Sequence, residues 1–380
     1  MTDKHNDSRL AAMLRALTPK AKEPVSAKVL NTWIAQAEGK LGEEAKGGRL
    51  GWLVASSVAI AAVQRATDVN GRQLFLLKGG TLLQHRLNAT ARATKDVDGL
   101  VRGDLDEFLL ALEDALAEPW GPLTLRRGEV EVVNVPTKMI KPRRFYIILE
   151  LRGVTWRRIQ FEVSPDEAGI GADSEAIEPP PLSGFGLPDP DILVGIAMRF
   201  QIAQKLHAVS DPHDPPAAIN DRPRDVVDLL LLRDLAADTG SPTLVEVRAA
   251  GAAVFDARAD EARQLGFPER AWPPDVVAHP HWTEDFNRAA ASAGVTLSLD
   301  EAVAEVNAWI KAIELDAVLA AEAKAVEEAE VTSDPDAPLP PHVKVTRGRS
   351  APPRTSADYL AGAIDSELPA DQARDRYGLD

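Results

Sequence analysis

The amino-acid sequence predicts an α+β protein, in which a small mixed β-sheet domain is followed by a helical bundle domain. Short apolar segments, some alternating with polar residues, gather in the first half, and helical periodicity dominates the second half. Between the halves lies a stretch rich in proline, glycine and acidic residues. We therefore expect an N-terminal helical extension over 1–49, a core domain over 50–165, a linker over 166–191, a helical domain over 192–325 and a poorly ordered tail over 326–380.

In the first half, the apolar spacing before residue 50 indicates one or two amphipathic helices. Further helices are expected over 50–66, 81–87 and 104–116, the last with an acidic start that suits the helix dipole. We expect strands over 74–78, 94–100, 124–135, 144–151 and 156–163. In the last strand apolar and polar residues alternate, so that Glu162 points away from the apolar face.

In the second half, every segment has a helical pattern. We expect helices over 192–210, 224–237, 242–262, 283–293 and 299–323. The remaining residues are rich in proline, alanine and acid, which is typical of a poorly ordered tail.

Composition narrows the class of protein. With 380 residues, of which 45% are hydrophobic, the chain is long enough for two domains with real cores. No run approaches the roughly 18 apolar residues of a membrane span, and the polar N-terminus lacks a secretory signal, so we expect a cytoplasmic protein without membrane contact. The absence of cysteine excludes disulfides and thiolate chemistry and leaves oxygen-ligated metals open. We expect a monomer.

The charge distribution is uneven. A net charge of −15 argues against nonspecific coating of nucleic acid. Between Thr124 and Gln160, however, nine basic residues face three acidic ones, a local charge of +6. This stretch is either a solvated face on edge strands or a phosphate-facing patch on an otherwise acidic enzyme.

The most informative segment runs from Lys78 to Asp98. Gly79 and Gly80 follow a strand, so the backbone can approach a triphosphate, and the next helix, beginning near Thr81, offers unpaired N–H groups to its oxygens. Asp96 and Asp98 lie two residues apart on a strand, so both carboxylates project from one face. Such a pair can hold Mg²⁺, which keeps its other positions for water and substrate phosphates.

The second informative segment lies in the helical half. Lys205 is on an otherwise apolar helix, where it is either a surface lysine or a point charge aimed at phosphate across a cleft. Pro223 fits a first helical turn, which places Arg224 and Asp225 at a helix N-terminus, with Asp228 on the same face as Asp225. Asp225 could fix the lysine by a salt bridge or touch the substrate. The histidines His85, His207, His213 and His281 are not spaced as metal ligands.

Together these motifs resemble a known family. Strand, Gly-Gly-Thr, helix, strand and Asp-x-Asp is the layout of polymerase-β-type nucleotidyltransferases. The chain also contains Lys78-Gly-Gly-Thr, Arg92-x-Thr-x-Asp-x-Asp, Gln204-Lys-Leu-x-Ala and Arg224-Asp-x-x-Asp-Leu, which are similar to motifs of the AbiEii/AbiGii toxin family. The resemblance spans roughly residues 50 to 315, including Trp272-Pro-Pro and Leu299-Asp-Glu-Ala-Val near its end.

The resemblance implies a toxin that transfers nucleotides from an NTP to an RNA acceptor, with tRNA as the expected acceptor at its 3′ end, and that is countered by an antitoxin encoded beside it. Asp96 and Asp98 would bind Mg²⁺, or Mn²⁺ in its place, with Glu162 as third carboxylate. Lys205 would bind the triphosphate and Asp225 would complete the site. The expected nucleotide-binding residues are Lys78, Gly79, Gly80, Thr81, Thr94 and Arg224.

Two departures from the family pattern bear on the site. Glu162 stands where aspartate is usual and is one methylene longer, and Arg224 stands where lysine is common. Two other functions stay open. The same fold could modify a protein hydroxyl or a small molecule, or the chain could be an inactive relative that binds or regulates. The intact Asp96 and Asp98 argue against the inactive relative.

Overall fold

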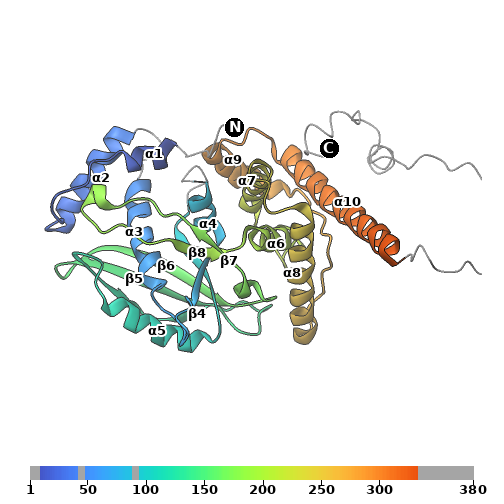
Figure 1. Ribbon diagram of the computed structural model, residues 1–380, viewed down its shortest axis with the longest axis horizontal. Helices are drawn as coiled ribbons and strands as arrows, with labels where there is room; N and C mark the ends of the chain where they lie inside the picture. Colours follow the sequence, from blue (N-terminus) through green and yellow to red (C-terminus); the bar gives the residue numbers. More distant parts are fainter. Residues whose placement is uncertain (1–8, 42–47, 88–93, 333–380) are drawn as a thin grey trace, which may run out of the picture.

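The computed structural model describes residues 9–41, 48–87 and 94–332, which form a sheet domain and a helical domain lying side by side (Figure 1). The mixed sheet followed by a helical bundle confirms the predicted α+β fold. Arg92, next to the Thr94 motif, and the predicted tail beyond Thr332 lie outside the described residues.

The sheet domain contains five α-helices and eight strands among the described residues. Its helices are α1 Arg9–Arg15, α2 Ala27–Leu41, α3 Arg49–Val63, α4 Gly79–Arg86 and α5 Leu105–Ala117. Its strands are β1 Phe75–Lys78, β2 Asp96–Val101, β3 Leu123–Arg127, β4 Glu131–Val132, β5 Arg143–Leu151, β6 Val154–Pro165, β7 Ser174–Ile177 and β8 Leu193–Ile196. The predicted strand over 124–135 is thus two short strands.

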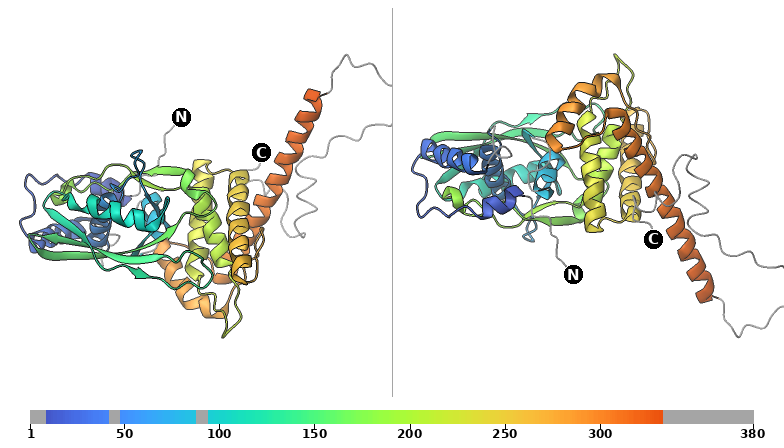
Figure 2. Two further views of the ribbon diagram at one scale, coloured as in Figure 1. Left: turned by 90° about the horizontal axis from the view of Figure 1, so that it is seen from below. Right: turned by 90° about the horizontal axis from the view of Figure 1, so that it is seen from above.

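The sheet has the strand order β3-β5-β6-β2-β1-β8-β7, with β4 paired to β5. β2 runs parallel to β6 and β1 parallel to β8, whereas the other pairs are antiparallel. On one face α3 packs against β5 and β6, and α5 packs against β3. The core on this face includes Phe75, Phe108, Phe145 and Phe161, all buried. Both helices lie on the inner side of the β5–β6 hairpin in Figure 2.

The helical domain contains α6 Met198–Val209, α7 Pro223–Thr239, α8 Leu244–Leu265, α9 Thr283–Ala293 and α10 Leu299–Thr332. A second apolar core fills it, built around Trp282, Phe286, Val306 and Leu229. Leu83 of α4 belongs to this second core, so the helix that leaves the glycine turn packs on both domains. Within the described ranges, no helix is long and apolar enough to cross a membrane.

The segment 166–191 is not the linker that its composition suggested. It holds the short 3₁₀ helices η2 Ile170–Ala172 and η3 Ser183–Phe185 as well as β7, which pairs with β8 at the sheet edge. Ile170, Phe185 and Leu187 are buried in the sheet-domain core. A four-residue strand among prolines and glycines is too short to show an alternating pattern, so its composition concealed it.

Three other boundaries differ from the prediction. β8 occupies the start of the expected helix 192–210, because a short apolar run fits a strand as well as a helix. The N-terminal helices are part of the sheet domain, since Leu14 and Leu30 are buried in its core. Helix α10 continues to Thr332, into the expected tail, through alanine- and glutamate-rich sequence that favours helix.

The N-termini of α5 and α7 form as their sequences predict. Asp104 caps α5, and its carboxylate accepts hydrogen bonds from the N–H groups of Asp106 (2.8 Å) and Glu107 (3.0 Å). In α7, Pro223 begins the helix as expected.

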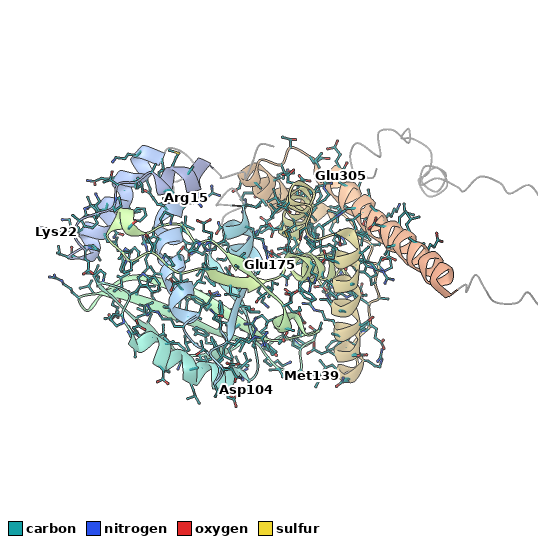
Figure 3. All side chains as sticks on the ribbon, in the orientation of Figure 1. Arg15, Lys22, Asp104, Met139, Glu175 and Glu305 are labelled. Carbon is teal, nitrogen blue, oxygen red and sulfur yellow. The ribbon has the colours of Figure 1, made fainter. Side chains whose placement is uncertain are left out.

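Glu175 lies between the two domains in Figure 3, where it pairs with Arg86 of α4 and accepts a hydrogen bond from the N–H of Met198 at 2.8 Å. These contacts join α4, β7 and α6.

Candidate active site

The turn from β1 into α4 is shaped by its contact with Asp98. Gly79 has a φ of +66°, and a Cβ at this position would lie 2.1 Å from Asp98 Oδ2. Only glycine combines the left-handed backbone with this close approach. The turn therefore places the start of α4 directly beside the Asp98 carboxylate.

Asp98 belongs to a row of charged residues across four strands. The strand register pairs Lys78 with Asp98, Asp98 with Glu162 and Glu162 with Arg144. Paired residues project from the same face of a sheet. The row Lys78–Asp98–Glu162–Arg144 thus carries two carboxylates between two cations, on the face opposite α3 and α5, and Asp96 projects from that same face.

Burial and neighbouring carboxylates set the protonation of this row. Burial raises the pKa of Asp98 to about 6, and the charges of Asp96 and Glu162 act in the same direction, against Lys78 and Lys205. Burial also lowers the pKa of Lys78, whose ammonium donates a hydrogen bond to Ser164 Oγ at 2.6 Å. Together with Asp96, this face holds three carboxylates against the two cations Lys78 and Arg144, and a divalent cation would supply the missing positive charge.

Glu162 does not join the two aspartates in a ready-made metal site. Its Oε2 accepts a hydrogen bond from Arg144 Nη2 at 2.8 Å, so Arg144 of β5 is its partner. Among the described residues, no group of three or more His, Cys, Asp or Glu is arranged to hold a metal ion. The carboxylates that remain for a cation are those of Asp96 and Asp98.

Two threonines position Asp96. The Thr81 hydroxyl is buried and donates to the Asp96 carbonyl at 2.7 Å, which ties α4 to β2. The Thr94 hydroxyl donates to Asp96 Oδ1 at 3.0 Å and so orients the carboxylate. The Thr81 hydroxyl is therefore engaged within the protein. Gly80 is buried in the first turn of α4.

Lys205 of α6 sits in a buried ion cluster with two aspartates of α7. Its ammonium donates to Asp225 Oδ1 at 2.8 Å and to Asp228 Oδ2 at 2.6 Å. The side chains of Lys205, Asp225 and Asp228 are 9%, 12% and 0% exposed. The charge of Lys205 also lowers the pKa of Asp98, so the cluster acts on the sheet carboxylates across the domain boundary. We call Lys205, Asp225 and Asp228 the α6–α7 triad.

The two domains are also joined by a hydrogen-bonded chain at the glycine turn. Gln201, one turn before Lys205 on α6, donates from Nε2 to the Gly79 carbonyl at 2.9 Å and accepts from Arg86 Nε at 3.0 Å. Gln201 thus fixes the turn and the triad relative to each other. Arg224, by contrast, is exposed on α7 and is not brought to this cluster.

The family described as nucleotidyl transferase AbiEii toxin, type IV toxin–antitoxin system, matches residues 61–320, which is more than half of the chain. The chain belongs to the AbiEii nucleotidyltransferase toxin family. This confirms the resemblance and the enzyme class predicted from the motifs, and membership in a toxin–antitoxin family implies an antitoxin as partner.

Solved structures show weaker likeness to this AbiEii-family chain. JHP933 from Helicobacter pylori is 12% identical, with a TM-score of 0.40, and the match covers 72% of this chain and 96% of that one. MenT4, a nucleotidyltransferase toxin from Mycobacterium tuberculosis, is 15% identical, with a TM-score of 0.34 and coverage of 70% and 99%. No curated protein matches the chain.

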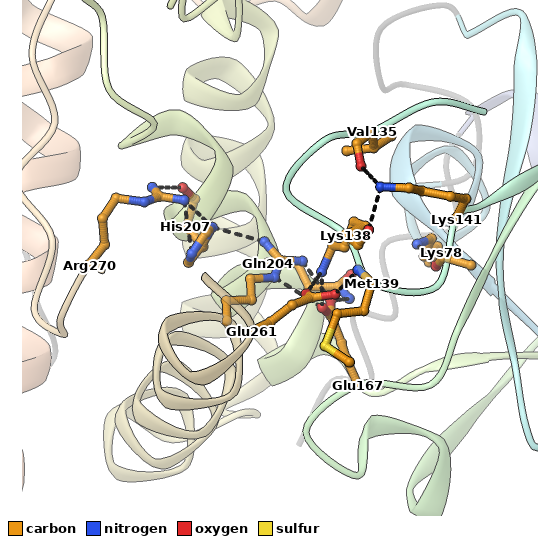
Figure 4. Close-up of polar contacts among 12 residues, drawn as sticks. Lys78, Val135, Lys138, Met139, Lys141, Glu167, Gln204, His207, Glu261 and Arg270 are labelled. Carbon is orange, nitrogen blue, oxygen red and sulfur yellow. Dashed lines mark hydrogen bonds and ion pairs between the residues drawn. The ribbon is translucent and has the colours of Figure 1, made fainter. Parts of the chain in front are cut away.

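A second polar network lies near Lys78, where the sheet domain meets α6 and α8 (Figure 4). Lys138, in the loop between β4 and β5, donates to Glu167 and to Glu261 of α8, both at 2.9 Å. Arg258 of α8 also donates to Glu167, at 2.6 Å. Although burial would raise the pKa of Glu167, Arg258 and Lys138 hold that pKa well below its usual value. This network links the sheet domain to α8.

His207 lies at the edge of this network. Its ring packs 4.7 Å from that of Phe255, centroid to centroid, and receives hydrogen bonds from Arg258 and Arg270. Burial and these two guanidinium groups lower the pKa of His207 to about 2, so the imidazole is neutral. His207 on α6 therefore acts as a hydrogen-bond acceptor for Arg258 and Arg270.

The structure also groups histidines that are far apart in the sequence. The ring of His213 lies 4.3 Å from that of His279 and 4.6 Å from that of His281, centroid to centroid. Sequence spacing did not reveal this cluster, because the contacts join the loop after α6 to His279 and to the short 3₁₀ helix η4 Pro280–Trp282, which contains His281.

Four of the nine basic residues between 124 and 160 are engaged in ion pairs. Arg126 pairs with Glu150, Arg127 with Glu113, Lys138 with Glu167 and Arg144 with Glu162. The nearby acids come largely from other strands and helices, which is why the local sequence alone suggested a strong excess of positive charge. These ion pairs reduce the positive charge that the sequence suggested for this stretch.

Proposed function

We propose that this AbiEii-family chain adds nucleotides from an NTP to the 3′ end of an RNA, with tRNA as acceptor, in a Mg²⁺-dependent reaction. The observation that carries the proposal is the position of the Asp98 carboxylate beside Gly79 at the start of α4, with Asp96 tied to α4 by Thr81 and the charge of Lys205 acting on Asp98 from α6. Carboxylates for a cation, N–H groups for phosphate and a facing ammonium are what a triphosphate site requires.

Asp96 and Asp98 would hold Mg²⁺, or Mn²⁺, which supplies Lewis-acid neutralisation of phosphate charge when bound. Thr94 keeps the Asp96 carboxylate oriented. The N–H groups of Gly79, Gly80 and Thr81 bind phosphate oxygens, and Lys205 adds positive charge from the opposite side. Glu162 contributes only after it leaves Arg144.

In the proposed reaction, the 3′ hydroxyl oxygen of the RNA attacks the α-phosphorus of the NTP. A new phosphodiester bond forms, the bond to the β-phosphate breaks and pyrophosphate leaves. The chain contributes chiefly by positioning and electrostatics, because the two oxygens must lie in line through the α-phosphorus.

The test is transfer of label from each of the four α-labelled NTPs to total tRNA, with Mg²⁺, Mn²⁺ or chelator. We expect labelled tRNA with wild type and divalent cation, and none with Asp96→Asn or Asp98→Asn. Asp106→Asn, an exposed carboxylate on α5, is the matched control and keeps wild-type labelling. Label on protein in place of RNA, or no label with any NTP, would contradict the proposal.

A further inference from the structure

The sheet face that carries Asp96 continues as an open surface onto β6 and β5. The register pairs Asp96 with Gln160, and Gln160 with Tyr146. Gln160 and Tyr146 are partly exposed, and the next outward-facing residue of β6, Arg158, is exposed. In both views of Figure 2 the β5–β6 hairpin forms an outer side of the sheet domain. A flat, open surface therefore begins at the candidate metal ligands.

An arginine stacked on an aromatic ring dominates this surface. The guanidinium carbon of Arg158 lies 4.9 Å from the centroid of the Tyr146 ring. The Tyr146 hydroxyl donates to Gln160 Oε1 at 3.0 Å, which fixes the ring in its plane. We call Tyr146, Arg158 and Gln160 the Tyr146 face. Its members are held in place without any ligand.

The neighbouring charges on this surface are already balanced. Arg126 pairs with Glu150 at 3.0 Å and Arg144 with Glu162 at 2.8 Å. Ile148 is paired in register with both Arg126 and Arg158. Its side chain is only 5% exposed and adds apolar area to the base of this surface. The surface thus offers stacking planes and a single stacked guanidinium, and only a small excess of positive charge.

We propose that the Tyr146 face binds the single-stranded 3′ end of the acceptor RNA, with one nucleobase stacked on the Arg158–Tyr146 pair. This inference rests on the proposed function and names the acceptor subsite of the same active site. Guanidinium planes and aromatic rings are the surfaces on which unpaired bases stack, and they bind without regard to sequence.

The position of the Tyr146 face suits the nucleotide next to the reacting end. Tyr146 lies two strands from Asp96, which corresponds to about 10 Å at the usual strand spacing. A base stacked there leaves the terminal ribose free to reach the carboxylates. A flat stacking surface favours an unpaired strand over a duplex, whose bases are already stacked on each other.

The experiment measures binding separately from transfer. Fluorescence anisotropy with a short 5′-fluorescein single-stranded RNA gives the Kd of wild type, Arg158→Ala, Tyr146→Ala and Tyr146→Phe. We expect Arg158→Ala and Tyr146→Ala to weaken binding by about tenfold or more, and Tyr146→Phe, which keeps the ring, to weaken it less than Tyr146→Ala does. Arg288→Ala removes an equal charge from an exposed position on α9 and should keep the wild-type Kd.

Salt dependence gives a second readout. Because most cations on this surface are paired, we expect only one or two phosphate contacts, and so a slope of log K against log salt of about −1. Since Arg158 is exposed, Arg158→Ala should unfold at the wild-type temperature, which separates lost binding from lost folding.

The outcomes distinguish this inference from the proposed function. If wild type labels tRNA but Arg158→Ala binds and uses RNA with unchanged Kd and KM, the Tyr146 face is not the acceptor site and the proposed function stands. If wild type binds the oligonucleotide through Arg158 but never labels RNA, the proposed function fails and the subsite stands. Absence of single-stranded RNA binding, or equally tight binding of duplex RNA, overturns the inference.

Discussion

The charged row on the sheet and the α6–α7 triad contain similar residues in opposite states. In the row, Asp98 and Glu162 lie next to each other between Lys78 and Arg144, and burial together with like charge raises the pKa of Asp98. In the triad, two aspartates share one ammonium, and all three side chains are almost fully buried. Both aspartates of the triad accept hydrogen bonds from their ammonium. In the row, Lys78 donates to Ser164 and Arg144 donates to Glu162, and the pKa of Asp98 stays raised.

The charged row and the triad therefore have different roles in the site. A group of carboxylates that is poorly compensated in the free protein gains most from a bound cation, so the row is suited to bind one. A buried ion cluster with good geometry is costly to disrupt and holds its members fixed. We therefore expect the row to matter for chemistry and the triad to matter for both folding and phosphate binding.

Removing the cation of the triad should have the largest effect on stability. Lys205→Met leaves Asp225 and Asp228 buried without their shared ammonium, which we expect to cost about 3–5 kcal/mol of unfolding free energy. Urea unfolding measures this loss. Lys311→Met, on α10 in the same domain, is the control and should change little. A Lys205→Met protein as stable as wild type would show that the triad is not held by its lysine.

Changing the row should instead affect activity and spare stability. We expect Asp98→Asn to reduce label transfer on the order of a thousandfold, equivalent to about 4 kcal/mol of transition-state stabilisation. Because the folded pKa of Asp98 is raised to about 6 from 3.8, wild type loses stability as the pH rises through this interval. Asp98→Asn removes that loss, so its unfolding midpoint at neutral pH should equal or exceed that of wild type. A marked destabilisation would contradict the comparison.

The glycine turn offers a matched pair of variants that isolates the contact with Asp98. Gly79→Ala places a methyl group 2.1 Å from Asp98 Oδ2, whereas Gly153, with a φ of +77°, has nothing within 4 Å. Both variants bear the strain of a left-handed alanine, about 1–2 kcal/mol. Only Gly79→Ala should also lose activity, by roughly a hundredfold, through displacement of the carboxylate. Equal activity in the two variants would show that the turn does not position Asp98.

The smallest expected effect concerns the buried histidine of α4. Burial lowers the pKa of His85 to about 4 from 6.5, so the unfolded chain takes up a proton that the folded chain refuses. Stability should therefore fall as the pH drops from 6.5 toward 4, by about 1–2 kcal/mol at pH 5 for this residue. His85→Leu removes that part of the slope, as urea midpoints measured across this pH range would show. Identical slopes in the two proteins would mean that His85 is protonated in the folded state.

Features of the sequence that depend on local spacing were predictable. The strand, glycine turn and helix around Gly79, and the projection of Asp96 and Asp98 from one strand, follow from local patterns, and the structure has them at nearly the expected boundaries. Asp225 and Asp228 share a helix face because they are three residues apart, and the structure turns both toward Lys205.

Features that depend on strand register were not predictable. Arg144 is the partner of Glu162 because β5 and β6 pair in one register, and a shift of one residue would have separated them. The same holds for the Tyr146 face, which joins residues of two strands to Asp96 on a third. The sequence shows that Gln201 lies one helical turn from Lys205, which places both on one side of α6. Its contact with Gly79 was not predictable, because that contact depends on how the two domains dock.

The most direct test of the account is the position of the bound cation. Crystals grown with Mn²⁺ and a non-hydrolysable NTP, measured for anomalous scattering, should show manganese between the carboxylates of Asp96 and Asp98, with the triphosphate directed toward Lys205. Manganese bound elsewhere, or a triphosphate bound away from both the aspartates and the triad, would contradict it.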